Sequence, residues 1–378
     1  LLTLGAAGDG ELMAAVSSMP ECEDIANIAT DDLAAILYTS GTTGRSKGAM
    51  LSHGNLAANA RVLFAYWHWQ NNDVLLHALP IYHVHGLFVA LHCALLGASR
   101  VIFMPRFEVS TVLQKLPEST VMMGVPTFYT RLLDDAGFNR SICSNMRLFI
   151  SGSAPLLAET HRDFEARTGH RILERYGMTE TGMITSNPYD GERIAGTVGY
   201  PLPGINARVA DNDCRELPRG ESGVLEIAGP NVFQGYWQMP DKTAEEFRAD
   251  GWFITGDIAV MDDDGRVTIV GRAKDLIISG GFNVYPKEVE SEIDALPGVK
   301  ESAVIGVPHP DFGEGVTAIV VADDSTEINE QIIFDALRDR LARFKQPKQI
   351  FIVDELPRNT MGKVQKNILR KSYRDIFK

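Results

Sequence analysis

The feature that most constrains this chain is a loop rich in glycine and hydroxyl groups, which follows an apolar run at residues 33–37. From Leu37 to Gly48 it reads Leu-Tyr-Thr-Ser-Gly-Thr-Thr-Gly-Arg-Ser-Lys-Gly. Glycines let a backbone turn with positive φ and approach a ligand closely, and main-chain N–H groups, hydroxyls and an ammonium group together suit a polyphosphate. The pattern predicts a strand that ends in a phosphate-binding loop, with a solvated linker as the alternative.

This loop does not follow the Walker pattern of nucleotide-binding proteins. The lysine, Lys47, is followed by Gly48 instead of the Ser or Thr that would hold Mg²⁺ in that pattern. The prediction of a phosphate loop therefore depends on the other motifs of the chain.

The composition is that of an ordinary globular protein, because 378 residues with 45% hydrophobic and 22% charged side chains can form a large core and two or more domains. The net charge of −13 argues against wholesale binding to nucleic acid or to an anionic membrane. Residues 338–378 differ, because twelve Lys and Arg residues there oppose four Asp and Glu residues. We expect this basic segment to face an anion, or in part to be a solvated helical face.

The cysteines and the apolar runs indicate a soluble chain in a reducing, cytoplasmic environment. Cys22, Cys93, Cys143 and Cys214 form no CxxC pair or Cys/His cluster, so we expect four core residues and neither a zinc site nor a disulfide framework. No apolar run approaches eighteen residues, and no signal peptide is visible. Because the chain starts at Leu1, we also expect that an N-terminal portion is absent.

Short apolar runs alternate with stretches of helical spacing in the first half of the chain, after an acidic connector at residues 11–32. The predicted strands are Val74–Ala78, Val101–Met104, Val121–Val125 and Leu148–Ser151. The predicted helices are Leu51–Trp67, Leu87–Leu96, Thr127–Ala136 and Leu156–Thr168. Strand, helix and strand at this spacing predict an α/β fold with a parallel sheet.

The sequence pattern changes after Tyr189, where predicted strands separated by Gly and Pro indicate a smaller β-rich subdomain. Beyond a composition break near residues 272–275, two helices and two strands predict a compact α+β domain. These elements are expected at Pro286–Leu296, Val299–Val307, Val316–Val321 and Gln331–Leu341. We therefore divide the chain into an N-terminal domain at residues 1–273 and a C-terminal domain at residues 274–378.

Five further sequence blocks accompany the loop. They are Pro80–His83 (PIYH), Glu174–Glu180 (ERYGMTE), Phe253–Asp257 (FITGD), Gly271–Ile277 (GRAKDLI) and Pro357–Lys363 (PRNTMGK). In order and spacing, these blocks and the loop resemble the characteristic blocks of the adenylate-forming acyl-CoA synthetase superfamily, which includes luciferases and adenylation domains. Within that superfamily, residues 175–188 and 359–366 are most similar to the malonyl-CoA synthetases.

The resemblance covers essentially the whole chain and implies a fold and an activity. The implied fold is a large N-terminal α/β domain with a small β subdomain, lacking the first part of a full-length family member, and a mobile α+β C-terminal domain. The implied activity is ligation of malonate to coenzyme A with ATP and Mg²⁺. The carboxylate attacks the α-phosphate to give malonyl-AMP and pyrophosphate, and the thiol of CoA then displaces AMP. Methylmalonate is the expected second substrate.

The resemblance also implies which side chains bind the nucleotide. Transfer at phosphorus requires charge neutralisation, which an anion-binding loop, a divalent cation and a lysine can supply. The loop would hold the β- and γ-phosphates through Thr39, Ser40, Gly41, Thr42, Thr43, Gly44 and Lys47. The other expected nucleotide-binding residues are Tyr176 on adenine, Gly177, Met178, Thr179 at the α-phosphate, Asp257 and Arg272 at the ribose, and Lys363.

Four of the implied residues are assigned to catalysis. Lys363, in a loop that contains glycine, would bridge the attacking carboxylate and the α-phosphate in the transition state. Glu180 would bind Mg²⁺ beside Thr179, and His83 would gate the passage between the acyl pocket and the thiol tunnel. Taken alone, Glu180 is equally a surface carboxylate, Asp257 a turn residue and His83 a buried core histidine.

The C-terminal domain of this superfamily pivots between the two half-reactions, and Lys274 occupies the matching hinge position. Gly280 and Gly281 would then let the pantetheine arm of CoA pass where a side chain would block it. A glycine pair in a hairpin turn is the alternative interpretation.

The choice of acid depends on Arg175. A guanidinium is permanently charged and binds a carboxylate in bidentate fashion, so Arg175 would take the distal carboxylate of a short dicarboxylic acid. It would disfavour plain fatty or aryl acids, which leave the buried charge unpaired. Ser153 would add a hydrogen bond, and Met183 and Val84 would limit the room at the α-carbon of the acid.

Several alternatives stay open at this point. One is that Arg175 forms a surface ion pair with Glu174 or Glu165. Others concern function: a CoA ligase for another short or medium carboxylic acid, a carrier-protein adenylation module that makes acyl-AMP without CoA turnover, or a non-catalytic binding fragment.

Overall fold

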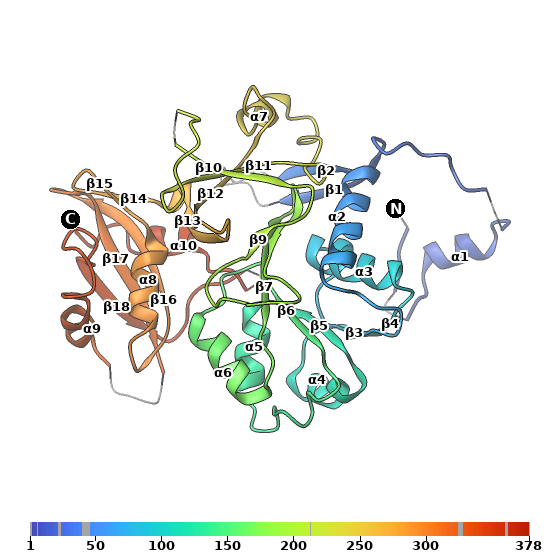
Figure 1. Cartoon of the computed structure of the whole chain (residues 1–378), viewed down its shortest axis with the longest axis horizontal. Coiled ribbons are helices and arrows are strands. Elements are labelled where there is room, and N and C mark those ends of the chain that lie inside the picture. Colours follow the sequence, from blue (N-terminus) through green and yellow to red (C-terminus); the bar gives the residue numbers. More distant parts are fainter. Residues whose placement is uncertain are drawn as a thin grey trace.

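The computed structural model describes residues 2–5, 7–21, 24–39, 46–211, 213–323, 328–359 and 362–377. These residues form a layered α/β region, an antiparallel β subdomain and a C-terminal α+β region (Figure 1). The fold class expected from the sequence is therefore confirmed.

The central sheet is built from strands of the first half of the chain. They are β3 (Val74–His77), β4 (Arg100–Phe103), β5 (Val121–Gly124), β6 (Leu148–Ser151), β7 (Leu173–Met178), β8 (Gly182–Ser186) and β9 (Tyr200–Pro201). Among the described residues the order is β4-β3-β5-β6-β7-β8-β9. The strands from β4 to β7 run parallel, as their alternation with helices predicts, whereas β8 and β9 are antiparallel to their neighbours.

Helices cover both faces of this sheet. Successive residues of a strand point to opposite faces, so apolar strands pack against helices on both sides. They are α2 (His53–Tyr66), the π-helix η1 (His85–Ala90) with α3 (Leu91–Leu96), α4 (Val109–Lys115) with the 3₁₀ turn η2 (Leu116–Glu118), α5 (Pro126–Leu133) and α6 (Ala158–Thr168). Leu75 of β3 packs in one apolar cluster with Trp67, whereas the next residue, Leu76, packs in another with Phe164 of α6. The sheet is thus buried between two helical layers.

The predicted phosphate loop connects two strands of a hairpin. β1 (Leu33–Thr39) pairs with β2 (Lys47–Ser52) in antiparallel register, so Thr39 lies opposite Lys47. The prediction that a helix begins at Leu51 is wrong by two residues. Ser52 caps α2 through a reciprocal pair of hydrogen bonds with Asn55, which fixes the start of the helix at His53.

An antiparallel β subdomain follows the central sheet, which confirms the β-rich subdomain predicted after Tyr189. Its strands are β10 (Asn206–Ala210), β11 (Ser222–Ala228), β12 (Phe253–Met261) and β13 (Val267–Arg272), with the short helix α7 (Pro240–Glu245) between β11 and β12. In the register of β12 and β13, Asp257 lies directly opposite Arg272.

The C-terminal part is an α+β unit, drawn in orange and red in Figure 1. Its elements are η3 (Ala273–Asp275), β14 (Ile277–Ser279), β15 (Phe282–Val284), α8 (Pro286–Asp294), β16 (Val299–His309), β17 (Gly313–Ala322), α9 (Glu330–Leu337), β18 (Gln349–Val353) and α10 (Lys366–Ser372). Val304 packs with Ile293 and Leu337 on one face of the sheet, whereas Ile305 packs with Leu369 on the other. The boundary between residues 273 and 274 stays a prediction.

Two local predictions are wrong. The expected connector contains a helix, α1 (Glu11–Ser17), which buries none of its residues. Cys93 and Cys143 are core residues, but Cys214 is exposed in a turn with φ of 67°, and Cys22 lies outside the described residues. Among the described residues, no helix is long and apolar enough to cross a membrane.

The basic segment at residues 338–378 forms ion pairs within the protein. Six of its twelve cations pair with carboxylates, which reduces the charge left for an external anion. These cations are Arg338, Arg340, Lys345, Arg358, Lys366 and Arg370.

A buried ion pair joins the starts of three parallel strands. Asp73, just before β3, accepts hydrogen bonds from Arg147 (Nε to Oδ1, 2.7 Å) and from Thr120 (2.8 Å), which precede β6 and β5. Burial raises the pKa of Asp73, but the hydrogen bonds from Arg147, Gln70 and Thr120 outweigh it and leave the pKa below 3.8.

We expect Asp73→Asn to lower the free energy of unfolding by about 3 kcal/mol at pH 7, because it leaves the partly buried Arg147 charge without its counterion. The folded-state pKa of Asp73 is depressed, so the contribution is present above pH 3.8 and is lost as the pH falls below it. Urea unfolding of both proteins between pH 7 and pH 3 measures this. Asp190→Asn, at an exposed ion pair with His68, is the control and should change nothing measurable.

Candidate active site

The predicted residues gather at the carboxyl ends of the parallel strands. Ser153 follows the end of β6, Arg175 lies in β7, and His83 follows β3. Parallel strands place their carboxyl ends along one edge of a sheet, where ligands of α/β folds bind. The positive charges of Lys363 and Arg175 both lower the pKa of His83, which places Lys363 near the same edge.

Arg175 is buried, with 2% of its surface exposed. Its Nε and Nη2 atoms have no hydrogen-bond partner among the described residues, and burial lowers its pKa to about 9. The predicted alternative of a surface ion pair is wrong, because Glu165 pairs with Arg171 (2.7 Å) and Glu174 accepts a hydrogen bond from the Leu156 N–H. The guanidinium is therefore a buried cation that can still accept an anion.

Gly152 explains how a guanidinium fits at this depth. A Cβ atom at position 152 would lie 2.3 Å from Nη1 of Arg175 and 2.4 Å from its Cζ. No real Cβ atom approaches another atom this closely, so the side chain of Arg175 occupies the space that glycine leaves free. Ser153 follows with φ of 72°, a left-handed conformation that is uncommon outside glycine.

His85 belongs to the same cluster, although the sequence analysis did not select it. Its Nδ1 lies 3.2 Å from the Ser153 hydroxyl, its Nε2 has no partner in the described part of the chain, and the residue is fully buried. Burial, Arg175 and His83 hold its pKa well below 6.5, so the ring is neutral. The second histidine of Tyr82-His-Val-His85 was the available signal, but spacing alone does not show that it faces Ser153.

Met183 and Val84 are both buried beside these residues. The main chain of Met183 is fixed on both sides by Asn59, which accepts its N–H (3.1 Å) and donates to its carbonyl (2.9 Å). A Cβ atom at Gly177 would lie 2.7 Å from the Met183 methyl group, so the glycine leaves the space that this side chain needs. The predicted apolar boundary is thus rigidly held.

The predicted nucleotide residues Tyr176, Asp257 and Arg272 contact one another. The Tyr176 hydroxyl donates a hydrogen bond to Asp257, and the Arg272 Nε lies 2.7 Å from the other Asp257 oxygen. Burial raises the pKa of Asp257, while Arg272 and Tyr176 act to lower it. Asp257 is 3% exposed, so it is neither a solvated turn residue nor free to move.

Lys363 enters this region from the C-terminal part. Its N–H donates to the Asn359 side chain (3.0 Å), and Gly362 before it has φ of 74° and approaches Thr127 at the start of α5. Solvent still reaches the lysine. The surrounding protein lowers its pKa, as do Arg272 and Arg175, whereas Asp257 and Glu180 oppose this shift. The charges of both predicted carboxylates therefore act on Lys363.

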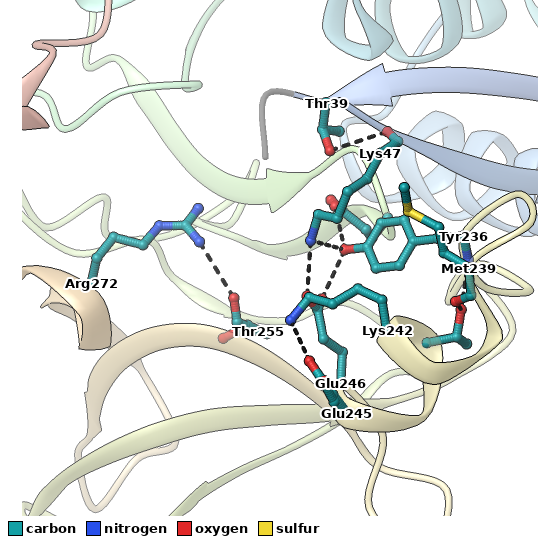
Figure 2. Close-up of polar contacts among 11 residues, drawn as sticks. Thr39, Lys47, Tyr236, Met239, Lys242, Glu245, Glu246, Thr255 and Arg272 are labelled. Atoms are coloured by element: carbon teal, nitrogen blue, oxygen red, sulfur yellow. Dashed lines mark hydrogen bonds and ion pairs between the residues drawn. The ribbon is translucent and has the colours of Figure 1, made fainter. Parts of the chain in front are cut away.

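Glu180 and Lys47 meet through a third residue, Tyr236. Glu180 is 5% exposed, so the surface-carboxylate alternative is wrong. The Tyr236 hydroxyl donates to Glu180 (2.9 Å) and Lys47 donates to the same hydroxyl (2.9 Å) and to Glu246 (2.8 Å). Figure 2 shows Lys47, Tyr236 and Glu246 pointing toward one another beside Thr39.

The remaining predicted residues are placed as follows. Thr39 donates a weak hydrogen bond to the Lys47 carbonyl (3.4 Å), and Met178 and Thr179 lie at the turn between β7 and β8. Lys274, the expected hinge residue, lies in η3 and is exposed. The other loop residues, Ser40, Gly41, Thr42, Thr43 and Gly44, lie outside the described residues.

Gly280 and Gly281 form the two central residues of the hairpin between β14 and β15. Ser279 pairs with Phe282 across the turn, and the two glycines have φ of 59° and 83°. Two consecutive positive φ values match the turn that a two-residue hairpin favours. The structure thus supports the hairpin interpretation of the pair, and its role at CoA is a proposal.

A separate hollow of about 560 Å³ lies at the edge strand β4. Its lining is Ile102, Phe103, Met104, Pro105, Arg106, Glu108, Thr111 and Lys115. Arg106 and Glu108 pair with each other (2.5 Å), and the lining includes no residue of the predicted site. The candidate site is therefore the cluster around Arg175, Glu180 and Asp257.

Two family models match the chain. The AMP-binding enzyme model covers residues 6–237, and the model of the AMP-binding enzyme C-terminal domain covers residues 288–363. The chain belongs to the AMP-binding enzyme family. This membership agrees with the superfamily that the six sequence blocks resemble.

Curated relatives in this family include two malonate–CoA ligases. The mitochondrial malonate–CoA ligase ACSF3 of Mus musculus is 40% identical over 374 residues, which cover 89% of this chain and 64% of that protein. The malonate–CoA ligase of Arabidopsis thaliana is 40% identical over 378 residues, covering 90% of this chain and 61% of that protein. The chain thus spans less than two thirds of the length of these relatives.

Solved structures of this AMP-binding family are also similar. ATP-bound MatB from Rhodopseudomonas palustris superposes with a TM-score of 0.98 at 60% identity, covering 100% of this chain and 75% of that one. The apo form of the same MatB gives a TM-score of 0.83. The chain therefore superposes more closely on the ATP-bound form than on the nucleotide-free form.

The placement of His83 gives a first test of this site. Burial, then Lys363, then Arg175 lower its pKa to about 4, so the ring should stay neutral between pH 5 and 8 in an NMR titration. Removing the charge with Lys363→Met should raise this pKa, although burial should keep it below 6.5. Lys366→Met, whose side chain pairs with Glu290, should leave it unchanged. An unchanged His83 titration in Lys363→Met would place the lysine elsewhere.

Proposed function

We propose that this protein joins malonate to coenzyme A with ATP and Mg²⁺, through a malonyl-adenylate, and releases AMP and pyrophosphate. The observation that carries the proposal is the buried Arg175 with two unpartnered guanidinium nitrogens beside Ser153. A bidentate carboxylate satisfies such a pair of donors, and a monocarboxylic acid would have no group to place there. Membership in the AMP-binding family and the malonate–CoA ligase relatives support the same reaction.

In the first step, an oxygen of one malonate carboxylate forms a bond to the α-phosphorus and the bond to pyrophosphate breaks. Lys363 would stabilise the negative charge on the carboxylate and the α-phosphate. The charges of Asp257 and Glu180 act on Lys363, whose pKa the surrounding protein lowers, and this supports the role. In the second step, the CoA sulfur forms a bond to the malonyl carbonyl carbon and AMP leaves.

The nucleotide would lie along the residues that meet at Asp257. Asp257 would accept hydrogen bonds from the ribose hydroxyls, with Tyr176 against the adenine, Arg272 at the ribose and Thr179 at the α-phosphate. The support is that Tyr176 and Arg272 already hold Asp257 in place from two different elements. Lys47 and the predicted loop would take the terminal phosphates.

Glu180 would hold the magnesium ion. Mg²⁺ in nucleotide sites is bound by one or two carboxylates together with substrate phosphates, and Glu180 offers one buried carboxylate oriented by a hydrogen bond from Tyr236. When bound, the cation neutralises the charge that develops on the phosphates.

The acid is proposed to be malonate first and methylmalonate second. Val84 and Met183 are buried, and the Met183 main chain is held by Asn59, so we place them at the α-carbon, where they would limit room for substituents. A ligase for another short or medium acid, and a carrier-protein adenylation module, are the competing functions. No specific observation favours either of these functions, because neither uses a buried, unpaired guanidinium.

We propose two domains, residues 1–273 and 274–378, that change their relative orientation at Lys274 between the two steps. The support is that η3 connects the β subdomain to an α+β unit with its own apolar clusters. CoA would approach past the Gly280–Gly281 turn, with His83 between the thiol and the acyl group.

We place the reaction in the cytoplasm, because the cysteine usage of the chain suits a reducing environment. The described cysteines, Cys93, Cys143 and Cys214, are free thiols.

Arg175→Ala should lower kcat/KM for malonate by roughly a hundredfold or more, because the distal carboxylate loses its charged partner inside the protein. Pyrophosphate release with malonate, methylmalonate, acetate and butyrate measures this, and the KM for ATP should change little. Arg171→Ala is the matched control, because Arg171 forms an exposed ion pair with Glu165. Rapid turnover of butyrate that persists in Arg175→Ala would exclude a dicarboxylate ligase.

Lys363→Ala should separate the two half-reactions. Adenylation should fall by roughly a thousandfold, because the transition-state charge loses its cation. Thioester formation from supplied malonyl-AMP and CoA should be largely kept, because Lys363 is proposed to act only in the adenylation step. Quenched-flow measurement of both half-reactions tests this, and equal losses in the two would refute the role of Lys363.

A further inference from the structure

Tyr236 and Glu246 connect two groups that the proposed function uses, although neither residue was expected to have a role. Tyr236 follows β11, and Glu246 directly follows α7. Lys47 Nζ lies 2.8 Å from Glu246 Oε1 and 4.1 Å from the centre of the Tyr236 ring. The same tyrosine hydroxyl lies 2.7 Å from Glu246 Oε2 and 2.9 Å from Glu180 Oε1.

One hydroxyl proton is therefore shared between two carboxylates. Tyr236 has a single O–H donor, so it cannot donate fully to Glu180 and to Glu246 at the same time. Lys47 occupies the acceptor side of the same oxygen. Burial and the two carboxylates raise the pKa of Tyr236 far above 10, so the hydroxyl keeps its proton and acts through hydrogen bonding only.

Glu246 is paired with cations before any nucleotide binds. It pairs with Lys47 (2.8 Å) and with Lys242 (3.4 Å), and Lys242 also pairs with Glu245. The surrounding cations lower the pKa of Glu246 despite its burial, so it is an anion at neutral pH. A phosphate that approaches Lys47 must therefore compete with a carboxylate that already holds it.

We propose that Glu246 is a positioning residue for Lys47. Before ATP binds, Glu246 occupies the place of the terminal phosphates at Lys47, and the phosphates then displace it. Tyr236 couples this exchange to Glu180 through its hydrogen bonds. This inference rests on the proposed function, because it takes Lys47 as a phosphate group and Glu180 as the cation group. When ATP and Mg²⁺ bind, Lys47 turns to the phosphates, Glu180 turns to the cation, and the Tyr236 hydroxyl donates its hydrogen bond to Glu246. Lys242 remains as the partner of Glu246.

Calorimetric titration of the protein with ATP and Mg²⁺, and separately with AMP, tests this exchange. AMP lacks the terminal phosphates, so only ATP binding should respond to the exchange. Glu246→Gln should bind ATP about fivefold more tightly, because the competing charge is gone. Tyr236→Phe should bind ATP with Mg²⁺ about tenfold more weakly, because Glu246, once Lys47 has left it, then lacks its hydrogen-bond donor. Both variants should bind AMP as the wild type does.

Glu245→Gln is the matched control. Glu245 precedes Glu246 and pairs with Lys242 at the surface, away from Tyr236 (Figure 2). It should bind ATP and AMP like the wild type. Weaker ATP binding in Glu246→Gln, or equal weakening of ATP and AMP binding in Tyr236→Phe, would mean that the residues only support the fold and would overturn the proposal.

The measurement separates this inference from the proposed function. A wild type that binds ATP but releases no pyrophosphate with malonate would refute the malonate ligase, and the order of ATP affinities among the variants would still decide the exchange. A wild type that binds ATP no more tightly than AMP would overturn the exchange, because the terminal phosphates would then have no partner in Lys47.

Discussion

A buried cation without an anion is the constraint on which the rest of this structure depends. Removing a charge from water costs several kcal/mol unless a partner compensates it. Arg175 is 2% exposed, and the pKa reduced to about 9 is the measure of that cost. The apolar layers on both faces of the central sheet provide the folding free energy that makes such a site tolerable. The unpaired charge of Arg175 thus lowers the folding stability at the candidate site, and an anionic ligand bound there would restore it.

The layered fold could be predicted from the sequence because its signal is local. Apolar runs such as Val121–Gly124 and Leu148–Ser151 are short, continuous and separated by helical spacing, which is typical of buried parallel strands. The second strand of the first hairpin could not be predicted in this way. Lys47–Ser52 is half polar, and it is a strand because it pairs with Leu33–Thr39 and because Ser52 delays the next helix.

The proximity of two candidate residues was predictable where motifs fix residue type and spacing, as for Asp257 and Arg272, which were both expected at one group of the ligand and lie opposite each other. It was not predictable where the partner comes from a distant segment. His85 matters through a hydrogen bond to Ser153, and Tyr236 and Glu246 through contacts that span 56 and 199 residues of sequence. Tyrosine and glutamate are ordinary residues, so only the folded arrangement separates Tyr236 and Glu246 from their neighbours.

The close contact between Gly152 and Arg175 has a consequence for how the protein measures a substrate. The guanidinium lies against the backbone, in space that a single Cβ would fill, so its position is set by the main chain rather than by side-chain torsions. In the proposed ligase, the distance from this fixed charge to the reacting carboxylate acts as a gauge of carbon number. Selectivity for chain length then depends on a missing methyl group at one glycine, and the apolar side chains around the acid only refine it.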